Sequence, residues 1–428
     1  MSFGRRSVTP AEKDARVRFF DVVVVGAGPA GLLAGLLLTR SRAHVAIFES
    51  GPSFERAYRG ETITPGTQQI FEDIGLRERV WDLGGGDPAG ITLVLRGKIY
   101  NIDLIGEGGK RIRQVPQAAL LGLLAEEARN AGALVELGSR VRGIVKENNR
   151  VAGITIVHDK HEEQIRARIV IAADGRFSVA RRDAQIALRN TSVPFDLIWA
   201  SGTGEGRRVQ VVVDRGEVFL AFPTTAQGAQ IGWLIPKGSY AEMRARGIEV
   251  LQARFAHALA QAPQKIEPKI DGFDDLALLP TVSQIAKRWT VPGLLLIGDA
   301  AHPMSPVGGQ GINVAIADAV VAARTIATIV REGDDDARLD DALRRVERER
   351  VPAVERVARQ QNLLPQLLRV LGAERSLGIL APYAQRISSS GAIPSPIRAM
   401  VERFMLGDPP VRANHGPWMT TPVPTKFL

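Results

Sequence analysis

The chain has 428 residues, of which 45% are hydrophobic and 24% are charged, as in ordinary folded proteins, and its length predicts two or three domains. It contains no cysteine, which excludes disulfides, iron–sulfur clusters, cysteine-bound zinc and thiol chemistry, so any redox reaction needs a bound cofactor. The net charge of +9 is spread along the chain with only 5% aromatic residues, which favours anionic small molecules and solubility over nucleic acid.

The N-terminal 18 residues are polar and basic and lack the apolar core of a signal peptide, so we expect a loose arm. The most apolar run, Val22 to Leu38, is long enough to suggest a membrane span. Five glycine and proline residues interrupt it, and a strand followed by a turn and a helix explains it better. We therefore expect a cytoplasmic protein without stable membrane insertion.

The sequence predicts a βαβ unit, which consists of a strand at Asp21–Val25, a helix at Ala30–Arg40 and a strand at His44–Glu49. The turn between strand and helix reads G-x-G-x-x-G: its first glycine permits the tight turn, the second lets a pyrophosphate approach, and the third lets helix and strand pack closely. An acidic residue ends the second strand, where it can bind a ribose. The residues expected to bind a dinucleotide here are Gly26, Gly28, Pro29, Ala30, Gly31, Glu49 and Ser50.

Two later apolar strands, Arg168–Ala172 and Leu294–Ile297, each run into an aspartate beside a glycine. Ligands of open α/β sheets bind at this carboxyl edge, and Asp299, beside glycines and a helix start, is well placed to bind sugar hydroxyls. The alternatives are an ordinary turn for Asp174-Gly175 and a helix cap for Asp299.

Between and after these strands the pattern changes. Two segments have a different character, Ile91–Asp103 and Phe195–Pro236. In the second, Val-rich and aromatic-bearing runs alternate with turns, which predicts an antiparallel sheet in a separate layer or domain. The chain after about Gly311 reads as helical. The apolar stretch Leu363–Leu380 is expected to pack on the body of the protein, with a dimer face, a lid or a membrane-surface helix as alternatives.

The three loops, in this order and context, resemble the FAD-dependent aromatic monooxygenases of the para-hydroxybenzoate hydroxylase type. The match spans Asp21 to Val330. It implies an α/β fold with a Rossmann-like FAD/NAD(P)-binding domain of the GR2 type, an inserted antiparallel β-sheet substrate domain and a helical C-terminus. The expected boundaries are an arm at 1–18, an FAD domain at 19–90, 104–190 and 281–335, a substrate domain at 91–103 and 191–280, and a C-terminal region at 336–428.

The resemblance also implies roles for particular residues. Asp299 would bind the flavin ribitol, Asp174 and Gly175 the pyrophosphate region and the nicotinamide cofactor, and Arg59 the FAD phosphates. Gln117 matches a family position that contacts the flavin. The remaining cofactor residues implied in this way are Gly298, Pro306, Gly308, Gly309, Gly311, Ile312 and Asn313, with Pro306, Gly308 and Gly309 lining the ring. Independently, the helix from Gly311 to Val330 points its positive end at that ring and can stabilise the charge of reduced flavin.

The implied activity is hydroxylation of an aromatic or polyketide-like small molecule with NAD(P)H and O2 through a flavin C4a-hydroperoxide. The NAD(P)H would bind transiently, because no second dinucleotide fold is visible in the sequence. No catalytic acid or base and no metal site is identifiable, and His302 is expected to pack or hydrogen bond locally. Among the aromatic residues of the predicted sheet, Phe222 and Trp233 are substrate candidates, although core packing is an alternative for both.

Other functions remain open at this point. A protein of the same fold can act as an epoxidase, a halogenase or an isoprenoid reductase, although the two-tryptophan motif of the halogenases is absent. A non-catalytic dinucleotide-binding protein with an acidic partner is a second alternative, but the glycine-rich segment Gly308–Asn313 speaks against it. A monomer or a homodimer fits the sequence equally.

Overall fold

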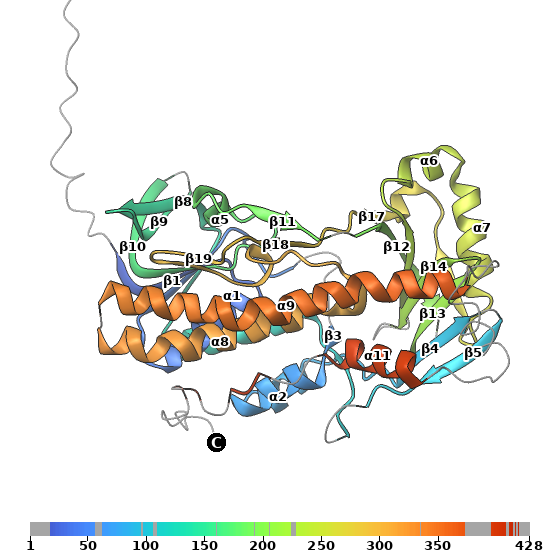
Figure 1. Cartoon of the computed structure of the whole chain (residues 1–428), viewed down its shortest axis with the longest axis horizontal. Coiled ribbons are helices and arrows are strands. Elements are labelled where there is room, and N and C mark those ends of the chain that lie inside the picture. Colours follow the sequence, from blue (N-terminus) through green and yellow to red (C-terminus); the bar gives the residue numbers. More distant parts are fainter. Residues whose placement is uncertain are drawn as a thin grey trace, which may run out of the picture.

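The computed structural model describes most of the chain. The described residues are 18–55, 62–95, 97–105, 109–159, 161–191, 193–204, 206–223, 228–333, 335–372, 395–407, 411–413, 416 and 418. Two eight-stranded sheets lie towards opposite ends of the long axis, and one long helix runs from the first to the second (Figure 1).

The first sheet forms around the βαβ unit. β1 (Phe19–Val25) lies between β2 (Val45–Glu49) and β10 (His161–Ala172) and is parallel to both. The strand order is β19-β20-β10-β1-β2-β7, with β7 at Leu134–Leu137, β19 at Thr290–Val291 and β20 at Leu294–Leu296. The centre of β1 is apolar at every position because both faces of the sheet are covered. The predicted parallel sheet is confirmed.

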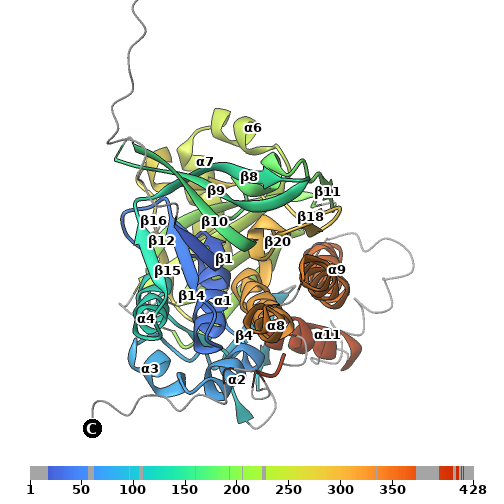
Figure 2. The same cartoon turned by 90° about the vertical axis from the view of Figure 1, so that its left-hand side faces the viewer.

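Helices cover one face of this sheet (Figure 2). α1 (Pro29–Arg40) packs against α4 (Gln117–Asn130) and α8 (Gly311–Glu332). α8 ends at Gly333, whose φ of 72° supplies the left-handed cap that reverses the chain into α9 (Asp336–Gly372). β8 (Arg140–Glu147) and β9 (Arg150–His158) extend the sheet beside β10.

One segment in the described part of the chain, Val307–Glu332, is long and apolar enough to cross a membrane. Within its most apolar window, 78% of the residues are buried inside the protein. Its apolar character is therefore accounted for by packing between α1 and α9.

The second sheet is the predicted antiparallel layer. Its order is β16-β12-β15-β14-β13-β4-β5, and only β4 and β13 pair in parallel. The strands are β4 (Gly90–Leu95), β5 (Lys98–Ile102), β12 (Phe195–Gly204), β13 (Arg208–Asp214), β14 (Glu217–Pro223), β15 (Gly228–Pro236) and β16 (Ile266–Lys269), and β17 (Ala277–Leu279) pairs with β12. The early segment 91–103 thus joins strands more than a hundred residues later. The domain boundaries themselves stay a prediction.

Two helices that the sequence analysis did not identify, α6 (Tyr240–Ala245) and α7 (Ile248–Leu259), follow β15. The buried residues of α7, Leu251, Phe255, Ala258 and Leu259, recur at helical spacing and cover one face of the second sheet. The other face of the second sheet packs against residues of α9 and α11 (Ser395–Leu406).

The shorter elements connect the two sheets. α2 (Pro65–Asp73) and α3 (Arg77–Asp82) follow β3 (Thr62–Ile63), which pairs with β6 (Arg113–Gln114), and β11 (Leu188–Asn190) pairs with β18 (Gln284–Ala286). The helical C-terminal region is confirmed for α9 and α11. The stretch Leu363–Leu380 lies partly outside the described residues.

Candidate functional site

The glycine turn after β1 has the geometry of a phosphate cradle. A Cβ added at Gly26, whose φ is 96°, would lie 2.5 Å from the carbonyl oxygen of Ala173, and one at Gly31 would lie 2.0 Å from that of Gly26. A Cβ at Gly28 would meet no protein atom within 4 Å. No side chain caps α1 and no acidic residue lies in its first turn, so its N-terminal N–H groups remain available to an anion.

Glu49 lies at the end of β2 next to this turn and is buried. One carboxylate oxygen accepts the N–H of Ala27 at 2.9 Å, and the other accepts the N–H of Gly51 at 2.9 Å and the hydroxyl of Ser50 at 3.2 Å. The carboxylate is therefore oriented by the backbone at the edge of the glycine turn.

The two aspartate loops are joined by a buried arginine. Arg181 of α5 (Val179–Asp183) is buried and donates to the carbonyl oxygen of Ala300 at 2.8 Å and to that of Arg176 at 2.9 Å. Asp299 lies in the 3₁₀ turn η4 (Gly298–Ala300), so Arg181 fixes that turn against the Asp174 loop.

Asp174 accepts the N–H groups of Val179 and Ala180 through Oδ2, at 2.7 and 3.3 Å. Its Oδ1 has no partner among the described residues. Burial raises the pKa of this carboxyl, against the opposing effect of the hydrogen bonds that it accepts. An unpartnered oxygen beside a glycine with a φ of 79° is available to a ligand hydroxyl or N–H.

The expected ring-lining segment forms the turn η5 (Val307–Gly309) and the start of α8. Gly308 has a φ of 76°, and a Cβ there would lie 2.3 Å from the ring of Phe404 in α11. Two buried side-chain amides hold this segment in place through hydrogen bonds. Gln361 of α9 donates to the carbonyl oxygens of Ser305 and Val307 at 2.8 and 2.9 Å, and Gln310 donates to that of Phe404 at 2.9 Å.

The side chain of Asn313 connects the start of α8 to β3. It accepts the N–H of Thr64 at 3.0 Å and donates to the carbonyl oxygens of Thr62 and Gly309 at 2.9 and 3.1 Å. Its amide is fully engaged within the protein, so only its backbone remains available to a cofactor.

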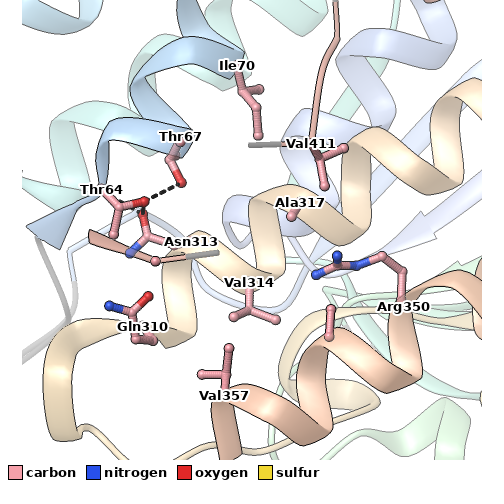
Figure 3. Close-up of a pocket in the computed structure, with 13 residues that line it drawn as sticks. Thr64, Thr67, Ile70, Gln310, Asn313, Val314, Ala317, Arg350, Val357 and Val411 are labelled. Carbon is pink, nitrogen blue, oxygen red and sulfur yellow. Dashed lines mark hydrogen bonds between the residues drawn. The ribbon is translucent and has the colours of Figure 1, made fainter. Parts of the chain in front are cut away.

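A cavity of about 60 Å³, lined in part by Asn313, lies between α2, α8 and α9 (Figure 3). Thr64 and Thr67 line it from one side and Arg350 reaches into it from α9. Small-molecule sites usually enclose roughly 300 Å³ or more, so this cavity is too small for a flavin or an aromatic substrate.

A buried ionic network in α8 and α9, which the sequence analysis missed, supports the Asp299 loop. Asp318 of α8 is fully buried and accepts from the N–H of Gly298 at 3.0 Å, from Nε of Arg350 at 2.7 Å and from Nε2 of His302 at 2.5 Å. Burial disfavours the charge, but the pKa of Asp318 is lowered because His302 and Arg350 outweigh burial. The local hydrogen bonding expected for His302 is confirmed, and an acidic residue inside an apolar helix was the available signal.

The two aromatic candidates lie on opposite faces of the second sheet. Trp233 is buried under α7, stacked on Phe219 with a centroid distance of 5.0 Å and edge-on to Phe255 at 5.6 Å. Phe222 is half-buried on the other face, 5.7 Å from the ring of Trp199. Trp233 therefore has the packing role that the sequence left open.

The remaining candidates are placed as follows. Gln117 begins α4, beside the short pair β3–β6, Ser50 is exposed after Glu49, and Ile312 is buried in α8 while Pro306 is exposed. Arg59 lies outside the described residues. In the part of the chain that is described, no three His, Asp or Glu side chains group as metal ligands.

These residues fit FAD. The open space over Gly28, the uncapped start of α1 and the oriented carboxylate of Glu49 suit an adenosine diphosphate, and the unpartnered Oδ1 of Asp174 lies in the neighbouring loop. α8 has no side-chain cap and no acidic residue in its first turn, so its positive end can face an electron-rich ring.

Comparison with known proteins agrees with this geometry. The family described as "FAD binding domain" matches residues 20–361. The 6-methylpretetramide 4-monooxygenase of Streptomyces rimosus is 33% identical over 400 residues, covering 92% of this chain and 94% of the relative. A digeranylgeranylglycerophospholipid reductase of Methanocella arvoryzae is 27% identical over 74% of this chain and 80% of the relative. The solved p-nitrophenol 4-monooxygenase of Pseudomonas putida superposes with a TM-score of 0.71 at 18% identity, over 91% of this chain and 98% of that one.

Proposed function

The chain belongs to the FAD binding domain family and is an FAD-dependent monooxygenase, and we propose that it hydroxylates a fused-ring aromatic polyketide with NAD(P)H and O2. The observation that carries the proposal is the relative that is 33% identical over nearly the whole length and whose name gives 6-methylpretetramide as its substrate. The reaction consumes one O2 and one NAD(P)H with a proton, and it yields the phenol, NAD(P)⁺ and water. The oxygen-transfer route expected from the sequence is part of the proposal.

In this proposal FAD, when bound, would supply the capacity to accept a hydride and to activate O2, and the chain would hold and orient the reactants. The turn at Gly28 and the start of α1 hold the pyrophosphate, Glu49 the ribose and Asp299 the ribitol. The N–H groups at the start of α8 stabilise negative charge on the ring, and the face of the second sheet that carries Phe222 positions the substrate.

An isotope experiment tests the hydroxylase function. The FAD-loaded protein is incubated with NADH or NADPH, 18O2 and 6-methylpretetramide, and the product is analysed by mass spectrometry. We expect one 18O atom in the product and substrate-stimulated NAD(P)H oxidation. NAD(P)H oxidation that yields only hydrogen peroxide with this amide and with related tetracyclic phenols would contradict the proposal.

The 27% identical reductase makes isoprenoid reduction a second candidate. Its products would gain two hydrogens for each reduced double bond and no oxygen, and formation would not need O2. Anaerobic incubation with dithionite-reduced enzyme and a geranylgeranyl lipid separates the two functions. The cytoplasmic location and the monomeric or homodimeric state expected from the sequence stay predictions.

A further inference from the structure

Arg350 brings a positive charge into the small cavity between α2, α8 and α9. Its residue is only 6% exposed, and its Nε atom donates to Asp318 at 2.7 Å. The two terminal nitrogens, which carry most of the N–H groups of the guanidinium, have no acceptor among the described residues. Figure 3 shows them pointing into the cavity. Because buried polar groups are nearly always paired, these N–H groups point to an acceptor that enters the cavity.

The start of α2 forms the wall of the cavity opposite Arg350 (Figure 3). Thr64, Gly66 and Thr67 line the cavity there. The helix has no side-chain cap and no acidic residue in its first turn, and the N–H of Gln68 donates to the carbonyl oxygen of Thr64. The N–H groups of Gly66 and Thr67 precede this first helical bond and therefore lack helical partners. A helix start of this kind favours a negative charge.

The hydroxyl of Thr67 is a further donor on the same wall. Its Oγ1 atom lies 3.4 Å from Oγ1 of Thr64, and the Thr64 hydroxyl donates to Oδ1 of Asn313 at 3.3 Å. Good hydrogen bonds between a hydroxyl and an oxygen are shorter than either distance. The protein therefore engages the Thr67 hydroxyl only weakly, and it can turn towards a ligand.

The remaining walls suit a weakly hydrated anion. No acidic side chain is found among the described residues that line the cavity. An apolar wall lowers the local dielectric constant and so strengthens the attraction between a guanidinium and an anion. The apolar side chains of this wall are Ile70, Val314, Ala317, Ala353, Val357 and Val411.

The size of the cavity limits the ligand to a small ion. A water molecule needs roughly 10–15 Å³ of such a cavity, and about 60 Å³ is present here. A halide ion is only slightly larger than a water molecule and fits together with a few waters. A single negative charge also matches the single guanidinium, whose own charge is shared with Asp318.

We propose that this cavity binds a halide ion, chloride under physiological conditions, with donors supplied by the terminal nitrogens of Arg350, the N–H groups of Gly66 and Thr67, and the Thr67 hydroxyl. The bound ion connects the start of α2 to Arg350 and, through Asp318, to the loop that carries Asp299. The proposal does not depend on the hydroxylase function, because the cavity is separate from the expected positions of the flavin and the substrate.

Chloride binding is measured by 35Cl NMR, in which exchange with a protein site broadens the line of the free ion. The FAD-loaded protein is titrated with sodium chloride, and sodium gluconate keeps the ionic strength constant because gluconate is too large for the cavity. We expect saturable broadening with a Kd in the millimolar range, since Asp318 partly neutralises Arg350. Sodium bromide should displace the chloride and narrow the line.

Variants of the cavity wall test the position of the ion. Replacing Arg350 would also remove a partner of the buried Asp318, so the other walls are changed instead. Thr67→Val keeps the shape and removes the hydroxyl, and it should raise the Kd about three- to tenfold. Ala353→Leu fills the cavity with an apolar side chain and should abolish the saturable broadening. The control Thr325→Val removes a hydroxyl that donates to Val321 within α8, and it should leave the Kd unchanged.

The variants are compared at equal FAD content, with circular dichroism as the check on folding. Wild-type protein without saturable broadening would overturn the proposal, with water as the occupant of the cavity. Broadening that A353L retains, or a Kd that T67V leaves as unchanged as T325V does, would also overturn it, because the ion then binds elsewhere. If A353L does not retain FAD, the comparison of T67V with T325V decides alone.

Discussion

The three glycines of the turn after β1 differ in what a methyl group would meet at each position. Gly26 and Gly31 are packed against backbone carbonyls at distances that no Cβ tolerates, whereas Gly28 faces open space. The first and third glycines therefore serve the fold, and the second serves the ligand. This division agrees with the sequence pattern, in which only the second glycine approaches the pyrophosphate.

We predict that Gly28→Ala folds normally and loses FAD affinity. Gly28 has a φ of −79°, which alanine adopts without strain, and its Cβ would project into the space proposed for the pyrophosphate. The Kd for FAD should rise about tenfold or more, which corresponds to about 1.4 kcal/mol. Flavin fluorescence quenching measures the affinity, and circular dichroism with thermal unfolding of the FAD-free protein checks the fold.

Gly31→Ala is the matched comparison. Its Cβ would clash with the carbonyl of Gly26, so the FAD-free protein should lose roughly 1–3 kcal/mol of stability from overpacking. If the FAD-free G28A protein is destabilised as much as G31A, or if G28A binds FAD as tightly as the wild type, the open space over Gly28 is not the phosphate site.

At the scale of elements, α9 connects the site to the C-terminal region. It runs from Asp336 to Gly372 through Pro352 and Pro365, each of which removes a helical hydrogen bond. Contacts with α8 and with β13 and β14 of the second sheet hold it in place. Gln361 lies between the two prolines, fully buried, and its amide fixes the turn η5. The helix thus holds the expected ring-lining segment in place.

We predict that Gln361→Leu destabilises the turn η5. The change keeps a side chain of similar size and leaves the carbonyl oxygens of Ser305 and Val307 without this donor, at a cost of roughly 1–3 kcal/mol. The melting temperature should fall, and FAD affinity should fall with it. The control is the neighbouring Gln360→Leu, on a half-buried side chain, which should change neither quantity appreciably. Equal effects of the two variants would show that the amide of Gln361 does not support the site.

The sequence predicted the local structure of the expected cofactor loops, but it did not predict the side-chain contacts that hold them in place. The glycine turn, the Asp174 loop and the start of α8 are local features, because turn and cap geometry depend on a few consecutive residues. Gln361 and Arg181 act on segments 54 and 119 residues away, which no local pattern reveals. The helix α7 was missed because its apolar spacing follows directly after a strand-like region.

At the scale of the whole molecule, one carboxylate of α8 links the loop 298–302 to α9. Asp318 binds the turn at Gly298, His302 after the Asp299 loop, and Arg350 in α9. Removing one partner of a buried ion pair leaves the other charge uncompensated, which costs about 3–5 kcal/mol. The network should therefore contribute both to global stability and to the position of the FAD loop.

We predict that Asp318→Asn destabilises the protein at neutral pH and reduces the acid dependence of its stability. The folded pKa of Asp318 lies below its unfolded value because the effects of His302 and Arg350 exceed that of burial. Between those two pKa values the unfolded chain binds more protons, so the stabilisation is complete above the unfolded value near 4 and is lost as the pH falls through the folded value. Urea unfolding of the FAD-free protein between pH 3 and pH 7 should give a shallower acid limb in D318N. The control Asp341→Asn, at a half-exposed side chain, should stay within about 0.5 kcal/mol of the wild type throughout. An acid limb in D318N as steep as that of the wild type would show that the titration of this carboxylate does not couple the FAD loop and α9 to global stability.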